Sequence, residues 1–259
     1  MGRLATSHEA EVDVIVLIKA APEIGRKHGE TVCVAGIDSY GKWHRLYPVP
    51  FRDLDPHQKF KRWDRIRVRW RKPLDDNRIE SKRIDPQSLR IVSEVKGHER
   101  YELAARAVVQ SLEIEKEQGR SLALIRPQNT KFVIKRQSEG EFLKAVRRRS
   151  ELLRQTDMFA QNILHKEPPP YSFFYEFDHA SFRRRHLCID WETEQTFFNW
   201  RRRYGEERTL ALMQDRWGDE MVKKGLMFAM GTHRVKMFNN WLLSGILQVQ
   251  DTKQALLTL

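Results

Sequence analysis

The stretch DRIRVRWR at residues 64–71 constrains the fold of this chain more than any other. Its strict alternation predicts a β-strand, because successive side chains of a strand point to opposite faces. One face then carries Ile66, Val68 and Trp70 toward a core. The other face carries four guanidinium groups, those of Arg65, Arg67, Arg69 and Arg71. We expect these four groups to emerge together on open surface, unclaimed by the protein's own acids, and to face an anionic polymer.

The charge balance of the whole chain favours the same kind of partner. Lys and Arg number 47 against 35 Asp and Glu, which gives a formal net charge of +12. Arginine suits phosphate groups because its planar guanidinium can donate two parallel hydrogen bonds. The alternative is a basic protein whose charges are merely solvated, since net charge constrains association and not fold. At 259 residues with 40% hydrophobic content, the chain can bury a substantial core.

Three zones follow one another along the chain, and together they predict an α+β protein. Residues 1–98 carry short β patterns separated by turns, which indicates a small barrel or sandwich; OB-like and PUA-like barrels are nucleic-acid-binding examples of that architecture. Residues 99–167 form a helical connecting region that we expect to pack on this domain. Three consecutive prolines at 168–170 suggest a boundary, because proline cannot continue a helix. Residues 168–259 are predicted to form a ββααββ module.

Local signals in the middle zone place two helices. The first is expected to end at Gly119, because glycine accepts the left-handed backbone conformation that follows many helices. The second is expected to start at a capping box, in which Ser138 and Glu141 satisfy each other's backbone N–H groups.

The segment RHLCIDWE at residues 185–192 carries the strongest signal for catalysis. As a strand it would place Asp190 and Glu192 on one face, where two carboxylates can share Mg²⁺ or Mn²⁺ for phosphodiester cleavage. His233, in the sequence GTHR, could assist proton transfer if folding brings it next to Asp190. The structural alternative is a wet strand face whose acids pair with arginines such as Arg201 or Arg234.

Basic and aromatic residues alternate in several further segments, a mixture that suits nucleic acid because rings stack on bases while guanidinium groups bind phosphate. Part of this pattern serves packing of helices on sheets. The best candidates for contact outside the arginine strand are Trp43, Arg45, Tyr47, Arg52, Arg183, Arg184, Arg201, Arg202 and Arg234.

Acidic residues between 75 and 85 could neutralise the arginine strand. Asp75, Asp76, Glu80 and Asp85 lie within 15 residues of Arg71. Cross-strand pairs of opposite charge are each worth only about 0.2–1 kcal/mol, but they would remove the free guanidinium groups. The expectation of an open cationic row therefore fails if most of the row is paired in this way.

The remaining features bear on location. Two cysteines, Cys33 and Cys188, show neither disulfide-framework nor zinc-ribbon spacing, so we expect a reducing cytoplasm. The N-terminus lacks an apolar segment of the secretory type. The longest apolar run, residues 14–21, is interrupted by Lys19 and is too short to cross a membrane, so no membrane partner is expected.

These patterns predict a protein that binds DNA or RNA mainly through phosphate contacts, with the N-terminal domain and its arginine strand as the main contact surface. Such binding requires no cofactor. A first alternative is a nuclease or phosphodiesterase that depends on Mg²⁺ or Mn²⁺ held by Asp190 and Glu192. A second is a basic subunit of a larger protein or ribonucleoprotein assembly.

Overall fold

The N-terminal half is built around a closed barrel of five strands. In the computed structural model, which describes residues 10–20, 23–25, 29–51, 53–154, 168–232 and 240–250, the strands pair in the order β1-β3-β4-β6-β5, and β5 returns to β1. The sequence predicted a small barrel or a sandwich, and the structure is the barrel. Strands β2 and β7 pair on its edges. The strands are β1 (Ala10–Lys19), β2 (Glu23–Gly25), β3 (Gly29–Ile37), β4 (Trp43–Val49), β5 (Asp64–Arg71), β6 (Ser81–Ile84) and β7 (Arg90–Glu94).

Alternation along the barrel strands decides which side chains fill the interior. Ile66 and Val68 of β5 are fully buried and pack with Val14, Val16 and Leu46. The predicted strand over residues 64–71 and its inward apolar face are thus confirmed. Short 3₁₀ turns η1 (Pro56–Gln58) and η2 (Pro86–Ser88) connect the strands around the barrel.

The rest of the chain forms two three-stranded antiparallel sheets covered by helices. One sheet has the order β11-β10-β9 and the other β13-β12-β8. The strands are β8 (Leu122–Ile125), β9 (Gln128–Arg136), β10 (Tyr171–His179), β11 (Phe182–Leu187), β12 (Leu226–Thr232) and β13 (Trp241–Gln248). The helices are α1 (Gly97–Ala107), α2 (Leu112–Glu117), α3 (Glu139–Arg154), α4 (Trp191–Tyr204), α5 (Glu206–Met213), the π-helical turn η4 (Gln214–Glu220) and α6 (Met221–Lys223).

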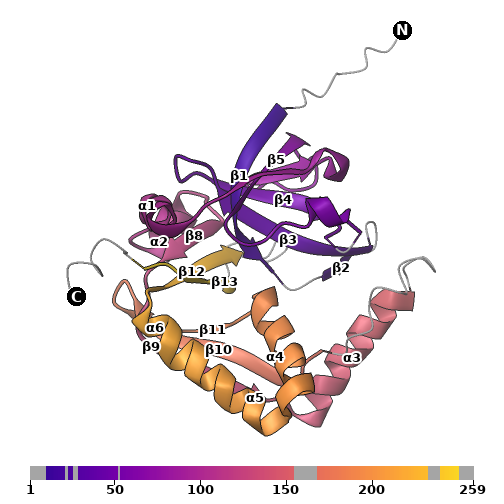
Figure 1. The fold of residues 1–259 in the computed structure, drawn as a ribbon, viewed down its shortest axis with the longest axis vertical. Coiled ribbons are helices and arrows are strands. Elements are labelled where there is room, and N and C mark those ends of the chain that lie inside the picture. The colour runs from indigo at the N-terminus through magenta and orange to yellow at the C-terminus, as the bar shows by residue number, and fades with distance from the viewer. Residues whose placement is uncertain are drawn as a thin grey trace.

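The sheet β13-β12-β8 lies between the barrel and the C-terminal helices (Figure 1). Leu124 and Ala229 pack in the cluster that includes Ile15 and Leu17 of the barrel strand β1. Ile125 and Phe228 pack in the cluster that contains Phe197 of α4 and Trp217 of η4. Because both faces of this sheet are covered, every residue of β12 is buried, as expected for a strand enclosed on two sides.

Two local predictions in the middle zone can be compared directly with the structure. The Ser138–Glu141 capping box forms, since the Ser138 N–H donates to the Glu141 carboxylate at 2.9 Å and the Glu141 N–H donates to Ser138 Oγ at 3.3 Å. The helical pattern before Gly119 is divided into α1 and α2. Gly119 follows the C-cap of α2 with a φ of 70°, in the left-handed region.

The triple proline separates two strands of one sheet. Strand β9 precedes the prolines and β10 follows them, and the two pair from Tyr171 opposite Arg136 to Asp178 opposite Gln128. Strands β8 and β12 likewise pair across it. The domain boundaries drawn from the sequence at residues 98 and 168 stay a prediction. None of the described helices combines enough length and apolarity to span a bilayer.

Candidate nucleic-acid interface

The arginine side chains of β5 point outward, but most of them pair with acidic side chains of the protein itself. Arg67 lies directly opposite Asp13 of β1 and donates two hydrogen bonds to its carboxylate, at 2.5 and 2.7 Å. Arg69 donates to Asp85 at 2.6 Å, and Arg65 donates to Ser39 at 2.8 Å and approaches Glu99 at 3.5 Å. The expectation that these three guanidinium groups stand unpaired is therefore wrong. Arg71, at the end of β5, is exposed.

These pairs arise because cross-strand neighbours on one sheet face lie within reach of each other. The hydrogen bond from Arg67 is the main reason why the pKa of Asp13 is lowered, so this carboxylate is ionised wherever the barrel is folded at neutral pH. Arg90 of β7 extends the ladder to Glu11 at 3.2 Å. The outer wall of the barrel is thus an array of alternating charges and not a uniform cationic surface.

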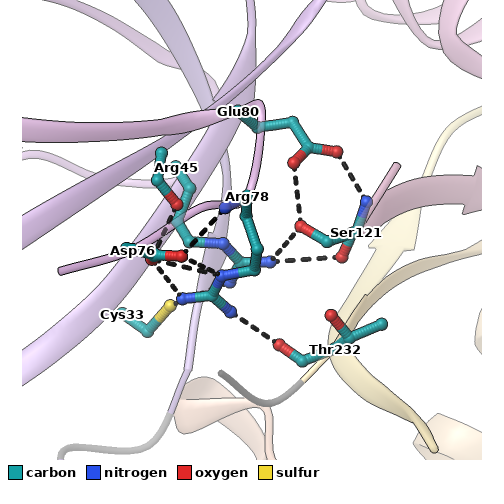
Figure 2. A network of polar contacts seen from close by, with 8 residues as sticks. Cys33, Arg45, Asp76, Arg78, Glu80, Ser121 and Thr232 are labelled. Carbon is teal, nitrogen blue, oxygen red and sulfur yellow. Dashed lines mark hydrogen bonds and ion pairs between the residues drawn. The ribbon is translucent and has the colours of Figure 1, made fainter. Parts of the chain in front are cut away.

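Trp43 and Arg45 of β4 lie inside the molecule, which contradicts their assignment to an exposed contact surface. Arg45 is only 5% exposed and donates from Nη2 to the carbonyl oxygen and the hydroxyl of Ser121, at 3.1 and 3.3 Å. Glu80 accepts the Ser121 N–H and Oγ–H at 2.6 and 2.8 Å. Figure 2 shows this network, in which Arg78 also donates to the Thr232 carbonyl oxygen. It connects the barrel to the start of β8 and the end of β12. Tyr47 is partly exposed.

Asp190 does not lie on a strand face. Strand β11 ends at Leu187, and Asp190 is the N-cap of α4, where its carboxylate accepts the Thr193 N–H at 3.3 Å. The predicted strand through residue 192 is therefore wrong, because the capping residue starts a helix instead.

The two carboxylates that we expected to share a metal ion share a guanidinium group. Arg62 Nη2 lies 2.6 Å from Asp190 Oδ1 and 3.4 Å from Glu192 Oε2, and Lys19 Nζ lies 3.6 Å from Glu192 Oε1. Within the described part of the chain, no group of three His, Cys, Asp or Glu side chains could hold a metal ion. The pair is thus already neutralised by two cations, at the junction between the barrel and α4.

Asp190 should give the protein a specific pH dependence. Burial raises its pKa from the ordinary 3.8 to about 6, although the Arg62 guanidinium acts in the opposite direction. The folded state then binds this proton more tightly than the unfolded state, so the stabilisation is fully present below the ordinary pKa and is lost as the pH rises through about 6. We expect the stability of Asp190→Asn relative to wild type to increase between acidic and neutral pH. Denaturant unfolding of both proteins across this range measures it, and parallel pH curves would contradict it.

Three residues singled out in the sequence, Arg52, His233 and Arg234, lie outside the described residues. Arg201 and Arg202 are exposed in the last turn of α4, where Arg201 pairs with Glu206 at 3.3 Å. Arg184 lies on the opposite face of β11 from Arg183 and Arg185 and pairs with Glu113 at 2.6 Å. Among those predicted nucleic-acid-binding arginines that the structure describes, only Arg183 of β11 lies in the sheet face described next.

The outer face of the sheet β11-β10-β9 combines an apolar row with cations. Alternate residues of β10, Phe173, Tyr175 and Phe177, point into the core. Their neighbours point outward, and the strand register arranges the outward residues in rows. The first row contains Val133, Phe174 and Leu187, and the second contains Lys131, Glu176 and Arg185. The last row contains Gln128, Asp178 and Arg183. At the other end of the sheet, Lys135 lies opposite Ser172. We call these residues the outer face.

Exposure and charge make the outer face suited to an anionic, ring-bearing ligand. Leu187 is 40% exposed and Phe174 half-buried, and the Arg185 guanidinium lies 4.7 Å from the centre of the Phe174 ring. Lys131 and Lys135 are exposed and form no ion pair within the described part of the chain. Arg183 and Arg185 pair with Glu176 or Asp178 at 3.1–3.8 Å. Four cations against two carboxylates leave a net positive face.

Sequence reasoning missed most of this face, although it placed strands at both KFVIKR and YSFFYEF. The alternation of Lys131, Val133 and Lys135 with the buried Phe132 was visible in the sequence. What was missing was the pairing of β9 with β10 across the triple proline, which brings Phe174 between Val133 and Leu187.

Comparison with known proteins finds two matching family models. The first is described as Domain of unknown function (DUF8758) and covers residues 10–110, which include the barrel. The second is described as Domain of unknown function (DUF8757) and covers residues 104–258, which include both three-stranded sheets. The two matches meet at the end of α1. The comparison with curated proteins finds no match.

Proposed function

The chain belongs to the family described as Domain of unknown function (DUF8757), and from its structure we propose that it binds single-stranded nucleic acid on the outer face of the sheet β11-β10-β9. One observation carries the proposal. The outward-facing row of Val133, Phe174 and Leu187, in which Leu187 is exposed and the other two are half-buried, is flanked by Lys131, Lys135 and Arg185 on an antiparallel sheet. Bases can stack on the central ring while the cations bind the phosphates on either side.

Single strands fit this face better than a duplex. A base that is already unpaired can lie flat on Phe174 and gain about 1–3 kcal/mol from stacking. A duplex would present mainly phosphates, and the arginines of the barrel wall are already paired with carboxylates, so they would bind those phosphates weakly. The net charge of +12 supports the same class of partner by attracting polyanions over long distances. The free cysteines Cys33 and Cys188 agree with a reducing compartment such as the cytoplasm, which stays part of the proposal.

A matched pair of triple substitutions tests the proposal. We expect Lys131→Ala/Lys135→Ala/Arg185→Ala to weaken binding of fluorescein-labelled single-stranded DNA or RNA by at least about tenfold, and to reduce the slope of log affinity against log salt by about 2. Fluorescence anisotropy over a series of salt concentrations measures both quantities. Phe174→Ala should weaken binding without changing the salt slope, because it removes stacking and no charge.

The control removes the same net charge from the barrel. Arg65→Ala/Arg67→Ala/Arg69→Ala should retain most of the affinity, since those guanidinium groups are paired with Glu99, Asp13 and Asp85. Equal losses in the two triple variants would mean that net charge alone drives binding. A larger loss in the barrel variant would place the interface on the arginine strand. If the protein binds none of the single strands or duplexes, the proposal is wrong. The alternative that the protein is a subunit of a larger assembly is then favoured.

A further inference from the structure

A cleft at the tip of the β10–β11 hairpin adjoins the outer face. Its volume is about 630 Å³, and its walls include Gln110, Arg126, Gln128, His179, Phe182 and Arg183. Small-molecule sites typically occupy about 300–1,000 Å³, so the cleft can hold a ligand of nucleotide size. Arg183 and Gln128 belong both to the cleft and to the last row of the outer face, which makes the two surfaces continuous.

The hairpin turn shapes the cleft. Ala180 and Ser181 have φ values of 50° and 65°, so the turn is the tight two-residue type with both residues in the left-handed region. This turn places His179 directly opposite Phe182. Phe182 is 55% exposed, and the Arg184 guanidinium lies 5.3 Å from the centre of its ring. The wall of the cleft therefore contains an exposed aromatic ring with a guanidinium group close to it.

The electrostatic character of the cleft is set by Arg126. Its guanidinium lies 5.4 Å from the centre of the Tyr101 ring and forms no ion pair within the described part of the chain. The one carboxylate in the wall, Asp178, is already occupied, because Asn129 Nδ2 donates to it at 2.7 Å and Arg183 at 3.1 Å. These contacts, first that of Asn129 and then that of Arg183, lower the pKa of Asp178. The available charge in the cleft is thus positive.

The remaining polar groups suit the edge of a base. Gln110 and Gln128 are exposed, and their side-chain amides each offer a donor and an acceptor. His179 is 8% exposed, its Nε2 has no hydrogen-bond partner among the described residues, and burial lowers its pKa, so its ring is neutral at pH 7. The cleft combines a ring for stacking, amides for hydrogen bonds and a single available cation.

We propose that this cleft binds one nucleotide, with the base against Phe182 and the phosphate on Arg126. Two sources supply this chemistry, a free nucleoside monophosphate or the phosphorylated end of a strand that lies on the outer face. The inference rests on the proposed function only for the second source. Stacking and a charge-assisted hydrogen bond both contribute to affinity, so neither a nucleoside nor phosphate alone should bind as tightly as the nucleotide.

Calorimetric titration tests the cleft directly. The protein is titrated with each of the four ribonucleoside 5′-monophosphates, with the matching nucleosides and with inorganic phosphate. We expect at least one nucleotide to bind, and Arg126→Ala or Phe182→Ala to weaken that binding by about tenfold or more. The matched control is Arg208→Ala, which removes an exposed arginine of α5 outside the cleft and should leave affinity unchanged. Failure of all four nucleotides to bind, or binding that neither cleft substitution weakens, would overturn the inference for the free nucleotide.

Oligonucleotides with a 5′-phosphate, a 3′-phosphate or neither distinguish the two sources. If a strand end occupies the cleft, one phosphorylated form binds more tightly, and Arg126→Ala abolishes that advantage. The outer-face triple variant should still bind the free nucleotide. Nucleotide binding without any oligonucleotide binding would contradict the proposed function but support the cleft as a nucleotide site. A different outcome would contradict the cleft inference and leave the proposed function standing. In that case oligonucleotide binding depends on Lys131, Lys135 and Arg185 but not on Arg126, and no nucleotide binds.

Discussion

Replacement of Glu80 by alanine is expected to lower the free energy of unfolding by about 3–5 kcal/mol. Glu80 is 6% exposed, and its two carboxylate oxygens accept the N–H and the Oγ–H of Ser121. Ser121 is fully buried and in turn accepts from the Arg45 guanidinium at 3.3 Å. Alanine at position 80 would leave the N–H and the Oγ–H of the buried Ser121 without their acceptors.

Equilibrium unfolding in urea measures the loss, and two variants provide the comparison. Glu80→Gln keeps an acceptor for the Ser121 N–H and should cost less than Glu80→Ala. Glu94→Ala removes an exposed carboxylate that pairs with Lys96 at 3.3 Å and Arg100 at 3.1 Å, and should cost at most about 1 kcal/mol. If Glu80→Ala is no more destabilising than Glu94→Ala, the network in Figure 2 contributes nothing to the attachment of the barrel.

Arg62→Ala is the second substitution expected to have a large effect, again a loss of about 3–5 kcal/mol. Arg62 lies just before β5 and reaches across to the N-cap of α4. It also donates from Nη1 to the backbone carbonyl oxygen of Ile246 on β13. Without Arg62, the pKa of Asp190 would rise further, so this carboxyl group at 3% exposure would either carry an uncompensated charge or bind a proton, and both lower the stability. The loss should be largest near neutral pH, where Asp190 is ionised.

A double-mutant cycle separates this charge effect from lost packing. Asp190→Asn keeps a side-chain acceptor for the Thr193 N–H, so the helix cap survives while the charge is removed. Arg62→Ala should therefore cost less in the Asp190→Asn background, with a coupling free energy above the roughly 0.5 kcal/mol scatter of independent sites. Arg90→Ala serves as the surface control, since its pair with Glu11 is more than half exposed on the arginine side. Identical costs in both backgrounds would show that Arg62 acts through packing alone.

Periodicity in the sequence was sufficient to predict several elements. The alternation over residues 64–71 predicted β5 and its buried Ile66 and Val68. The succession of short β patterns before residue 98 predicted a small barrel or sandwich. The Ser138–Glu141 signal predicted the start of α3. These predictions succeed because side-chain alternation and helix capping are local, so they depend on residues only a few positions apart.

Partners of charged residues could not be predicted in the same way. The sequence places Arg67 far from Asp13, yet the closure of the barrel by β1 and β5 puts them opposite each other. Arg62 and Asp190 are 128 positions apart and meet only because the barrel packs against α4. The free or paired state of an arginine is therefore a property of strand register and core packing.

The alternating and capping patterns of this chain are enough to establish its α+β class, the barrel strand with its outward arginines and the basic character of its surface. Tertiary structure alone decided which cations are available. The pairing of β9, β10 and β11 places Lys131 and Lys135, which form no ion pair within the described part of the chain, on one sheet face with Phe174. In the barrel, by contrast, Arg65, Arg67 and Arg69 each lie next to a carboxylate. The physical reason is that a charge is neutralised by whichever group folding brings within hydrogen-bond distance, and local sequence does not encode that distance.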